Sequence, residues 1–291
     1  MSVTDSFFRT LSLTDVILRV RDLDRVRAFY TERIGFQVTP GENGAVGLSP
    51  TGRPPVLLRL VHDPEAPPAT PGSAGLFHIA FLYPDRPALG RALRGLLDDG
   101  MRVGGADHGV SEALYLTDPE GNGLELYADR SPSDWPPSPG GGQVGMFTEP
   151  LDFPSLLHTA RRSAGHALPA ETRVGHLHLR VSDLDSAERF YAGHLGIPVR
   201  QRDYPGARFF GRDGYHHHLG ANVWHSRRAV TPGAAGLARF TLRVADDEAY
   251  AVLARSLSGE GLVAAGNSTW LETRDGDGLV IRVTLRDEAG A

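Results

Sequence analysis

Apolar and polar residues follow two periods along the first part of the chain, one typical of strands and one typical of helices. Residues 14–20 predict a strand, and residues 23–33 predict a helix. The apolar residues of this helix fall on one face: Val26, Phe29, Tyr30 and Ile34. Asp22 is placed to cap its N-terminus and Gly35 to end it. The pattern therefore predicts a strand followed directly by an amphipathic helix.

The same succession of a strand and a helix returns before residue 100. Between the two copies lie short strand-like runs, over residues 37–39, 45–48 and 56–60. A strand over 77–82 and a helix over 87–98 follow, and two more strands, 113–116 and 124–127, flank the turn 118–123. Each unit is thus predicted to contain one strand, one helix and further strands, which is a βαβββ module.

The second half of the chain repeats the first at an offset of 161 residues, the distance from residue 19 to residue 180. Residues 19–36 align without gaps on 180–197, and residues 75–81 align on 236–242. The expected elements of the second half are strands over 174–181 and 237–243, helices over 184–194 and 246–257, and a last hairpin around 275–278. The repeat predicts four βαβββ modules.

This pattern predicts an α+β fold with two modules in each of two domains. We expect the domains over residues 1–135 and 166–291. The segment between them, residues 136–165, is predicted as a linker, because proline and glycine are concentrated over 131–142.

Composition narrows the chemistry that these modules can perform. The 291 residues include 30 basic and 35 acidic side chains, a net charge of -5, with neither cysteine nor lysine. Disulfides, thiolate nucleophiles, Cys-ligated metals and Schiff-base lysines are therefore excluded. The charge argues against nucleic acid as a partner, and no apolar run approaches the roughly 20 residues that span a bilayer. Because the start also lacks a signal-peptide pattern, we expect a cytoplasmic protein with no membrane partner.

Histidine is unevenly distributed along the chain. Of the 12 histidines, nine lie between His158 and His225. Together with carboxylates and tyrosines, these side chains are the groups left for chemistry, so a functional site must account for their clustering.

Three segments carry a resemblance to known proteins. They are the repeated Val-x-Asp-Leu motif with Phe-Tyr and Gly that starts at Val20 and Val181, the segment 107–127, and the segment 214–224. They resemble the vicinal oxygen chelate superfamily, which includes glyoxalase I, extradiol dioxygenases and bleomycin-resistance proteins, and within it the two-domain catechol 2,3-dioxygenase-like branch. The resemblance covers nearly the whole chain. It implies two cupped, mixed β-sheet barrels with flanking helices, in which a pair of modules encloses one metal.

The resemblance also implies that metal ligands lie on the first strand of a module and, as glutamate, on its last strand. The matching first-strand positions are Asp15, His78, His176 and Arg239, and the matching last-strand positions are Glu125 and Arg282. The second and third modules together supply His78, Glu125 and His176. This is a 2-His-1-carboxylate set, the type that binds non-haem Fe(II) with open coordination positions. The first and fourth modules supply a poor cation site.

Two pairings of the modules are open at this point. If the second module pairs with the third, His78, Glu125 and His176 meet, and we favour this arrangement. If the first pairs with the second, the best set is Asp15, His78 and Glu125. Each residue also has a purely structural interpretation, because strand histidines are commonly hydrogen-bonded core residues and Glu125 could be a solvated edge carboxylate.

Further residues are predicted to line the same cup. Strand alternation places two pairs of histidines on one face each, His176 with His178 and His216 with His218. In extradiol enzymes the strand before the glutamate carries an active-site tyrosine, with a catalytic histidine upstream, and Tyr115 and His108 occupy similar positions. The resemblance therefore implies these catalytic residues: His108, Tyr115, His178, His216 and His218.

The function implied by the resemblance is extradiol ring cleavage of a catechol-type aromatic substrate with O2. Fe(II) is the expected cofactor, with Mn(II), Zn(II) and Ni(II) as alternatives, and a homodimer is compatible with the resemblance. Two other functions stay open, because the superfamily contains several activities. One is a metal-free ligand- or antibiotic-binding protein, and the other is a redox-neutral metal enzyme of the glyoxalase or epimerase type.

Overall fold

The computed structural model describes residues 11–42, 44–137, 144–160, 167–244 and 247–285. The elements of the first module are β1 (Leu11–Val20), α2 (Leu23–Ala28), the π-helical turn η1 (Phe29–Ile34), β2 (Gln37–Glu42), β3 (Ala45–Ser49) and β4 (Leu58–His62). Those of the second are β5 (Gly75–Leu82), α3 (Arg86–Asp98), β6 (Gly104–Asp107), β7 (Ser111–Thr117) and β8 (Gly123–Asp129). Both modules therefore have the expected order of elements.

The second half of the chain follows the same order after a short connection. The connection contains η2 (Pro132–Asp134), β9 (Glu149–Pro150) and α4 (Phe153–Thr159). The third module consists of β10 (Arg173–Arg180), α5 (Leu184–Glu188), the π-helical turn η3 (Arg189–His194), β11 (Val199–Gln201), β12 (Ala207–Phe210) and β13 (Leu219–Asn222). The fourth consists of β14 (Gly236–Val244), α6 (Asp247–Gly259), β15 (Val263–Gly266), β16 (Trp270–Arg274) and β17 (Val280–Thr284).

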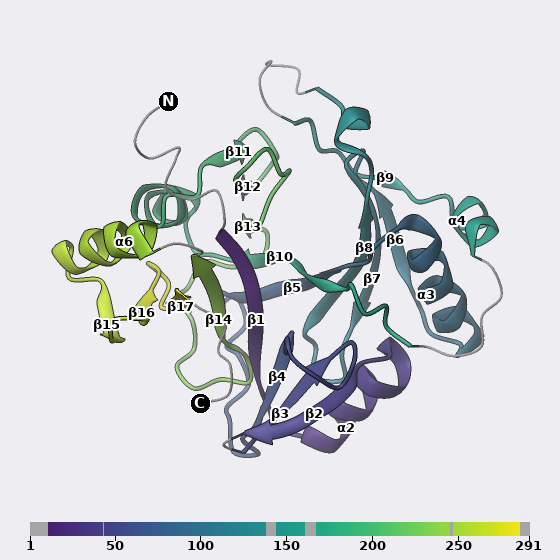
Figure 1. Ribbon diagram of the computed structural model, residues 1–291, viewed down its shortest axis with the longest axis horizontal. Coiled ribbons are helices and arrows are strands. Elements are labelled where there is room, and N and C mark those ends of the chain that lie inside the picture. Colours follow the sequence, from purple (N-terminus) through teal and green to yellow (C-terminus); the bar gives the residue numbers. More distant parts are fainter. Residues whose placement is uncertain (1–10, 43, 138–143, 161–166, 245–246, 286–291) are drawn as a thin grey trace.

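The described strands form two curved mixed sheets, and each sheet joins strands from both halves of the chain (Figure 1). One sheet has the order β15-β16-β17-β14-β1-β4-β3-β2, and the other has the order β11-β12-β13-β10-β5-β8-β7-β6-β9. The first module therefore pairs with the fourth through β1 and β14, and the second pairs with the third through β5 and β10. The α+β fold with two cupped sheets is confirmed, whereas the predicted domain boundaries stay a prediction.

Capping residues explain where the first helix of each half begins. The Asp22 side chain accepts a hydrogen bond from the backbone N–H of Arg25, as an N-cap does. Asp183 caps α5 in the same way. Gly35 ends the first helical segment with a φ of 93°, a left-handed conformation that glycine adopts without strain. The predicted single helices over 23–33 and 184–194 differ from the structure, because each changes to a π-helical turn after its first half.

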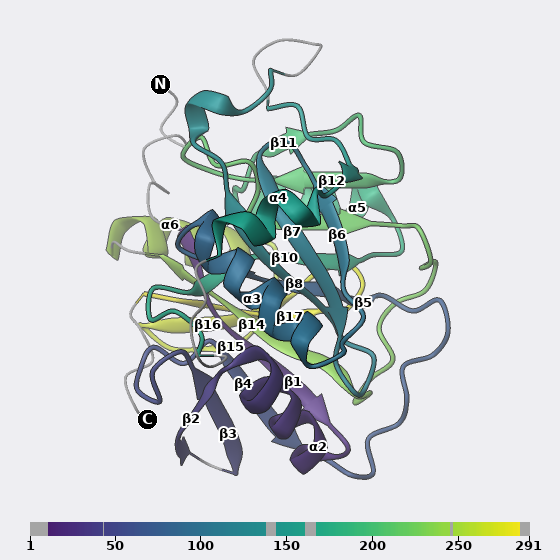
Figure 2. The same ribbon diagram turned by 90° about the vertical axis from the view of Figure 1, so that its right-hand side faces the viewer.

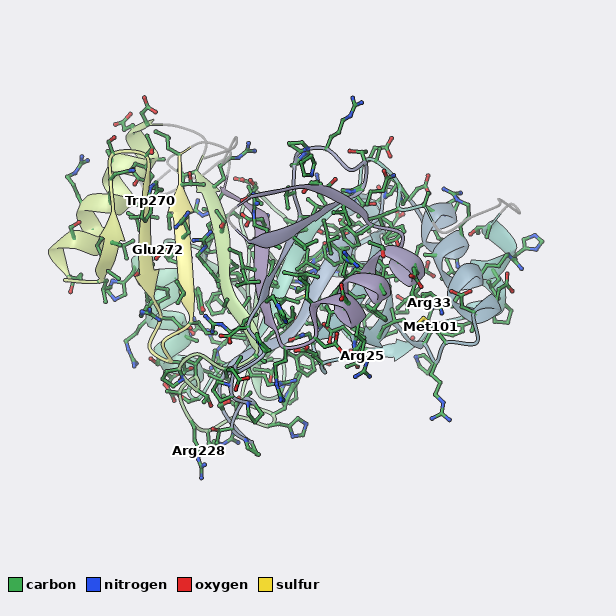
Figure 3. All side chains as sticks on the ribbon, turned by 90° about the horizontal axis from the view of Figure 1, so that it is seen from below. Arg25, Arg33, Met101, Arg228, Trp270 and Glu272 are labelled. Atoms are coloured by element: carbon green, nitrogen blue, oxygen red, sulfur yellow. The ribbon has the colours of Figure 1, made fainter. Side chains whose placement is uncertain are left out.

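Helices cover the outer faces of the sheets. Helix α3 is capped by Asp85 and packs its apolar face on β8, and α4 packs beside it (Figure 2). Most buried apolar residues of both sheets belong to one large core, and two smaller clusters lie beside it. Charged side chains such as Arg25 and Arg228 are exposed and point away from the molecule (Figure 3). Among the described residues, none of the helices has both the length and the apolar character needed to cross a bilayer.

Two sequence expectations differ from the structure in detail. The strand expected over 56–60 is β4, which lies two residues later. The expected linker, residues 136–165, contains β9 and α4 in its described part, and β9 extends the sheet at β6. Residue 246, at which the last helix was expected to begin, lies outside the described residues, and α6 follows directly after it.

Candidate metal centre

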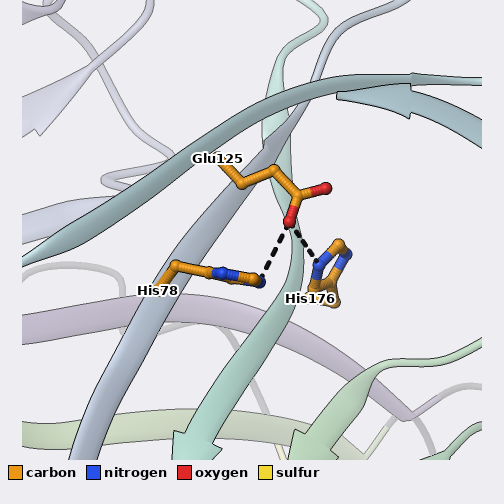
Figure 4. A group of neighbouring side chains, drawn as sticks. All are labelled: His78, Glu125 and His176. Atoms are coloured by element: carbon orange, nitrogen blue, oxygen red, sulfur yellow. Dashed lines mark hydrogen bonds and ion pairs between the residues drawn. The ribbon is translucent and has the colours of Figure 1, made fainter. Parts of the chain in front are cut away.

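Three adjacent strands carry the three predicted ligands, with His78 on β5, Glu125 on β8 and His176 on β10. Ala80 of β5 pairs with Glu125 on one side and with His176 on the other. His78 lies two residues from Ala80 and therefore on the same face of the strand. Because the side chain of Ala80 is small, the three longer side chains converge above it (Figure 4). One ligand atom from each lies within 4.8 Å of the others.

The distances within this group centre on one carboxylate oxygen. Oε2 of Glu125 lies 2.9 Å from Nε2 of His78 and 3.3 Å from Nε2 of His176. All three side chains are buried. Nε2 of His78 makes no hydrogen bond of good geometry within the described part of the chain, although the carboxylate is close. That nitrogen is therefore directed toward the space between the three groups.

The electrostatics keep these groups in the protonation states that bind metals. Burial by itself raises the pKa of Glu125, but the neighbouring His176 and His78 outweigh it and hold that pKa well below its usual range. Burial lowers the pKa of His176, and the attraction of Glu125 opposes this only in part. A carboxylate beside a neutral imidazole is the combination that a divalent ion requires.

A cavity of about 510 Å³ lies over the group, and His78, Glu125 and His176 form part of its wall. Aromatic side chains supply much of the rest of the wall: Phe77, Tyr115, Phe147, Tyr204, Phe209 and Trp224. His178 also lines it, and burial together with the nearby His78 and His176 lowers the pKa of His178 well below its usual value. Gly220 makes room for this ring, since a Cβ there would come within 2.9 Å of His178 Cδ2. Aromatic rings and the neutral ring of His178 thus line the cavity together.

His108 and Tyr115 are joined at the edge of the cavity, as their predicted roles require. Nδ1 of His108 lies 2.8 Å from the carbonyl oxygen of Phe147, which can only accept, so this nitrogen carries the proton. Nε2 of His108 lies 2.7 Å from the Tyr115 hydroxyl. Burial, followed by the charge of Glu125, raises the pKa of Tyr115 well above its usual value. Tyr115 is therefore a neutral phenol whose O–H donates a hydrogen bond to Nε2 of His108.

The histidine run 216–218 differs from the prediction. Among the described residues that line the cavity, the run contributes His217, which sequence reasoning missed. His216 is fully buried behind it. Nδ1 of His218 accepts the backbone N–H of Arg212 instead of facing the cavity. The expectation that His216 and His218 share the cavity face was wrong, because the run precedes β13 in irregular chain where strand alternation does not hold.

His216 nevertheless controls the state of His217. Nε2 of His216 lies 2.9 Å from Oδ1 of Asp129, which as a carboxylate accepts its proton. Nδ1 of His216 lies 2.8 Å from Nδ1 of His217, so it must accept from that nitrogen when both rings are neutral. Burial, followed by His176 and His216, lowers the pKa of His217 well below its usual value. His217 consequently keeps an unprotonated Nε2.

In the other sheet, the positions that correspond to the metal ligands hold ion pairs. Arg239 on β14 and Arg282 on β17 lie 2.9 Å and 2.8 Å from the same carboxylate oxygen of Glu272 on β16. Asp15 lies on β1 in this sheet, 3.5 Å from Arg59. The alternative ligand set of Asp15, His78 and Glu125 is therefore not assembled, because β1 and β5 belong to different sheets.

Comparison with known proteins places this geometry in a family. The model of the Glyoxalase/Bleomycin resistance protein/Dioxygenase superfamily matches residues 12–126 and 173–257. The chain belongs to this superfamily. Among its members, a catechol-2,3-dioxygenase of Bacillus subtilis (strain 168) is 41% identical over 249 residues, 84% of this chain and 86% of that protein. Biphenyl-2,3-diol 1,2-dioxygenase 3 of Rhodococcus globerulus is 32% identical over 124 residues, 41% of this chain and 64% of that protein.

Solved structures share the superfamily fold. A Bacillus subtilis protein assigned provisionally as a dioxygenase has a TM-score of 0.68 at 13% identity, over 96% of this chain and 86% of that one. Glyoxalase I from Zea mays has a TM-score of 0.55 at 17% identity, over 94% of this chain and 92% of that one. At these identities the structures show the fold alone.

Proposed function

We propose that the chain is an extradiol dioxygenase that opens the ring of a catechol-type substrate with O2, using Fe(II) held by His78, Glu125 and His176. The observation that carries the proposal is the buried His-Glu-His group at the wall of an aromatic cavity. The likeness to a protein named catechol-2,3-dioxygenase over 84% of this chain supports the same activity.

The group fits a divalent ion. Two ligand atoms bound at about 2.1 Å with angles between a right angle and the tetrahedral angle lie about 3.0–3.4 Å apart. The two Glu125-to-histidine distances, 2.9 Å and 3.3 Å, are close to this spacing, and all three ligand atoms lie within 4.8 Å of one another. Three protein ligands leave coordination positions for a substrate, and two imidazoles with one carboxylate favour iron among the divalent metals. When bound, the iron would act as a Lewis acid and as a template for catechol and O2.

The cavity walls would orient the ring. Phe77 packs edge to face against His178 and Trp224, and these two rings are tilted against each other, with all three ring centres 5.0–5.4 Å apart. Such a rigid aromatic wall would hold a planar substrate beside the ligand group and exclude water from it.

Neutral histidines would accept the catechol proton that ionisation releases. His178 and His217 line the cavity as neutral rings, and Nε2 of His178 is buried without a hydrogen-bond partner in the described part of the chain. His216 and Asp129 would hold His217 in the form whose Nε2 accepts a proton. A positioned base of this kind contributes about 10²–10⁴-fold to a rate. His218 is outside this set, because its Nδ1 accepts a hydrogen bond from the backbone N–H of Arg212. Burial is the main cause that lowers the pKa of His218 to about 4.

Tyr115 and His108 would act on the oxygen of the substrate. When His108 is protonated, its Nε2–H donates to Tyr115, and the tyrosine O–H becomes free to donate into the cavity. That donor would stabilise negative charge that develops on a substrate oxygen.

Anaerobic reconstitution with Fe(II), followed by O2 uptake with a panel of catechols, tests the proposal. We expect uptake of O2 and a yellow ring-opened product that depend on added iron. A protein that binds catechols but no metal would contradict the proposal in favour of a binding protein. Bound zinc or nickel without O2 uptake would contradict it in favour of a redox-neutral enzyme.

A further inference from the structure

A second cavity of about 870 Å³ adjoins the metal cavity. Two described residues line both cavities, Gly121 and Arg180. Because Gly121 has no side chain, Arg180 is the only side chain among the described residues that faces both spaces. A substrate substituent directed from the metal cavity toward the second one would therefore lie beside Arg180.

The position of Arg180 follows from the strand that carries a metal ligand. Arg180 is the last residue of β10, four residues beyond His176. Its guanidinium carbon lies 5.7 Å from the centre of the Phe77 ring, and that centre lies 5.2 Å from the centre of the His78 ring. The guanidinium is therefore at most about 11 Å from the His78 ring.

The charge of Arg180 has no protein counter-ion within the described residues. Burial lowers the pKa of Arg180, and no neighbouring carboxylate offsets this effect. By contrast, Arg239 and Arg282 at the other cup share Glu272. A half-buried cation without an anion is costly, and the face of Phe77 compensates only part of that cost.

We propose that Arg180 binds a carboxylate on the substrate, so that the preferred substrates are catechols with an acidic side chain. The assignment rests on the proposed function, because it takes the ring to lie at His78, Glu125 and His176. A catechol with a two-carbon acidic side chain at ring position 4 reaches about 8 Å from its chelating oxygens, which lies within the upper bound of about 11 Å between the guanidinium and the His78 ring. A guanidinium forms two parallel hydrogen bonds to a carboxylate, and a partly desolvated site strengthens them.

The test compares pairs of substrates that differ by one carboxylate group. The probes are catechols with a carboxymethyl group at ring position 3 or 4, each with its methyl counterpart. Wild type, Arg180→Gln, Arg180→Lys and Arg228→Gln are measured as anaerobic Fe(II)-loaded protein, by calorimetric binding and then by steady-state O2 uptake. Arg228 is the matched control, since it is exposed and is not among the described residues that line either cavity.

We expect wild type to prefer a carboxymethyl catechol over its methyl counterpart. Arg180→Gln should lower kcat/KM for the carboxymethyl compound about 10- to 100-fold, the loss typical of a charged hydrogen bond. The methyl compound should change less than threefold, Arg180→Lys should lose less, and Arg228→Gln should behave as wild type.

The outcomes separate the role assigned to Arg180 from the proposed ring-cleaving function. Equal losses for both members of a pair would show a structural effect of Arg180 and overturn the assignment, as would a wild type without preference. Ring cleavage without a carboxylate preference would leave the proposed function standing. Preferential carboxylate binding without ring cleavage of any catechol would overturn the proposed function and retain the role of Arg180 in anion binding.

Discussion

Tyr115→Phe isolates the role of one hydroxyl group in the cavity. The variant keeps the ring, which lines the cavity, and removes the O–H that lies 2.7 Å from Nε2 of His108. Two effects follow with different magnitudes. Loss of a neutral hydrogen bond costs about 1 kcal/mol of folding stability. Loss of a donor to an oxygen that becomes negative in the transition state costs about 3–4 kcal/mol, or 10²–10³-fold in kcat.

The assay must separate the two effects. The kcat for O2 uptake is measured at saturating catechol, and the free energy of unfolding is measured in urea on the same preparation. Tyr204→Phe is the control, because its hydroxyl lines the same cavity but bonds Thr148 at 3.0 Å. We expect Tyr204→Phe to stay within threefold of wild type. A folded, iron-loaded Tyr115→Phe that keeps more than a third of wild-type kcat would refute the reasoning.

Two further predictions concern the buried tyrosine–aspartate contact that the repeat places in both halves. Burial raises the pKa of Asp275 to about 6 from 3.8, so its stabilising contribution is complete below pH 4 and is lost as the pH rises through 6. The free energy of unfolding of wild type, relative to that of Asp275→Asn, should therefore fall by up to about 3 kcal/mol between pH 4 and pH 7. Both are measured by urea unfolding at each pH, and a difference between them that does not change with pH would contradict this. At pH 7, Tyr191→Phe should cost about 2 kcal/mol, because its hydroxyl donates to the ionised Asp275 at 2.7 Å. Tyr30→Phe should cost less than 1 kcal/mol, because its bond to Asp118 is 3.5 Å long, and equal losses would argue against distance as the cause.

The repeat made much of the scaffold predictable from the sequence. The motif that starts at Val20 and Val181 predicted both strand–helix units, and the aspartate within each motif is the N-cap that the structure shows. The resemblance to the superfamily implied His78, Glu125 and His176, whose ligand atoms lie within 4.8 Å of one another in the structure. Local periodicity suffices for the strand–helix units and their caps, because these depend on residues close in sequence.

Features that depend on long-range pairing were not predictable. The pairing of β5 with β10 was favoured because it joins the predicted ligands, and the structure confirms it, but local periodicity alone does not choose between the two module pairings. The change to π-helical turns has no sequence periodicity of its own. Helix α4 was missed inside the expected linker, although Asp152 at its N-cap and a proline in its first turn are helix-start signals.

The direction of side chains in irregular parts of the chain could not be predicted from the sequence either. His217 faces the cavity because residues 216–218 precede β13 rather than belong to it. Glu272 could not be linked to Arg239 and Arg282 until the strand register of the second sheet was known. The position of Arg180 between two cavities likewise follows from the assembled fold alone.

The most direct test of the account is the iron content of His176→Ala after anaerobic reconstitution. Wild type and the exposed control His62→Ala should each bind one Fe(II) per chain and consume O2 with catechol. His176→Ala should lose iron and activity together while it keeps wild-type unfolding cooperativity. Stoichiometric iron in folded His176→Ala would contradict the claim that His78, Glu125 and His176 form the metal centre.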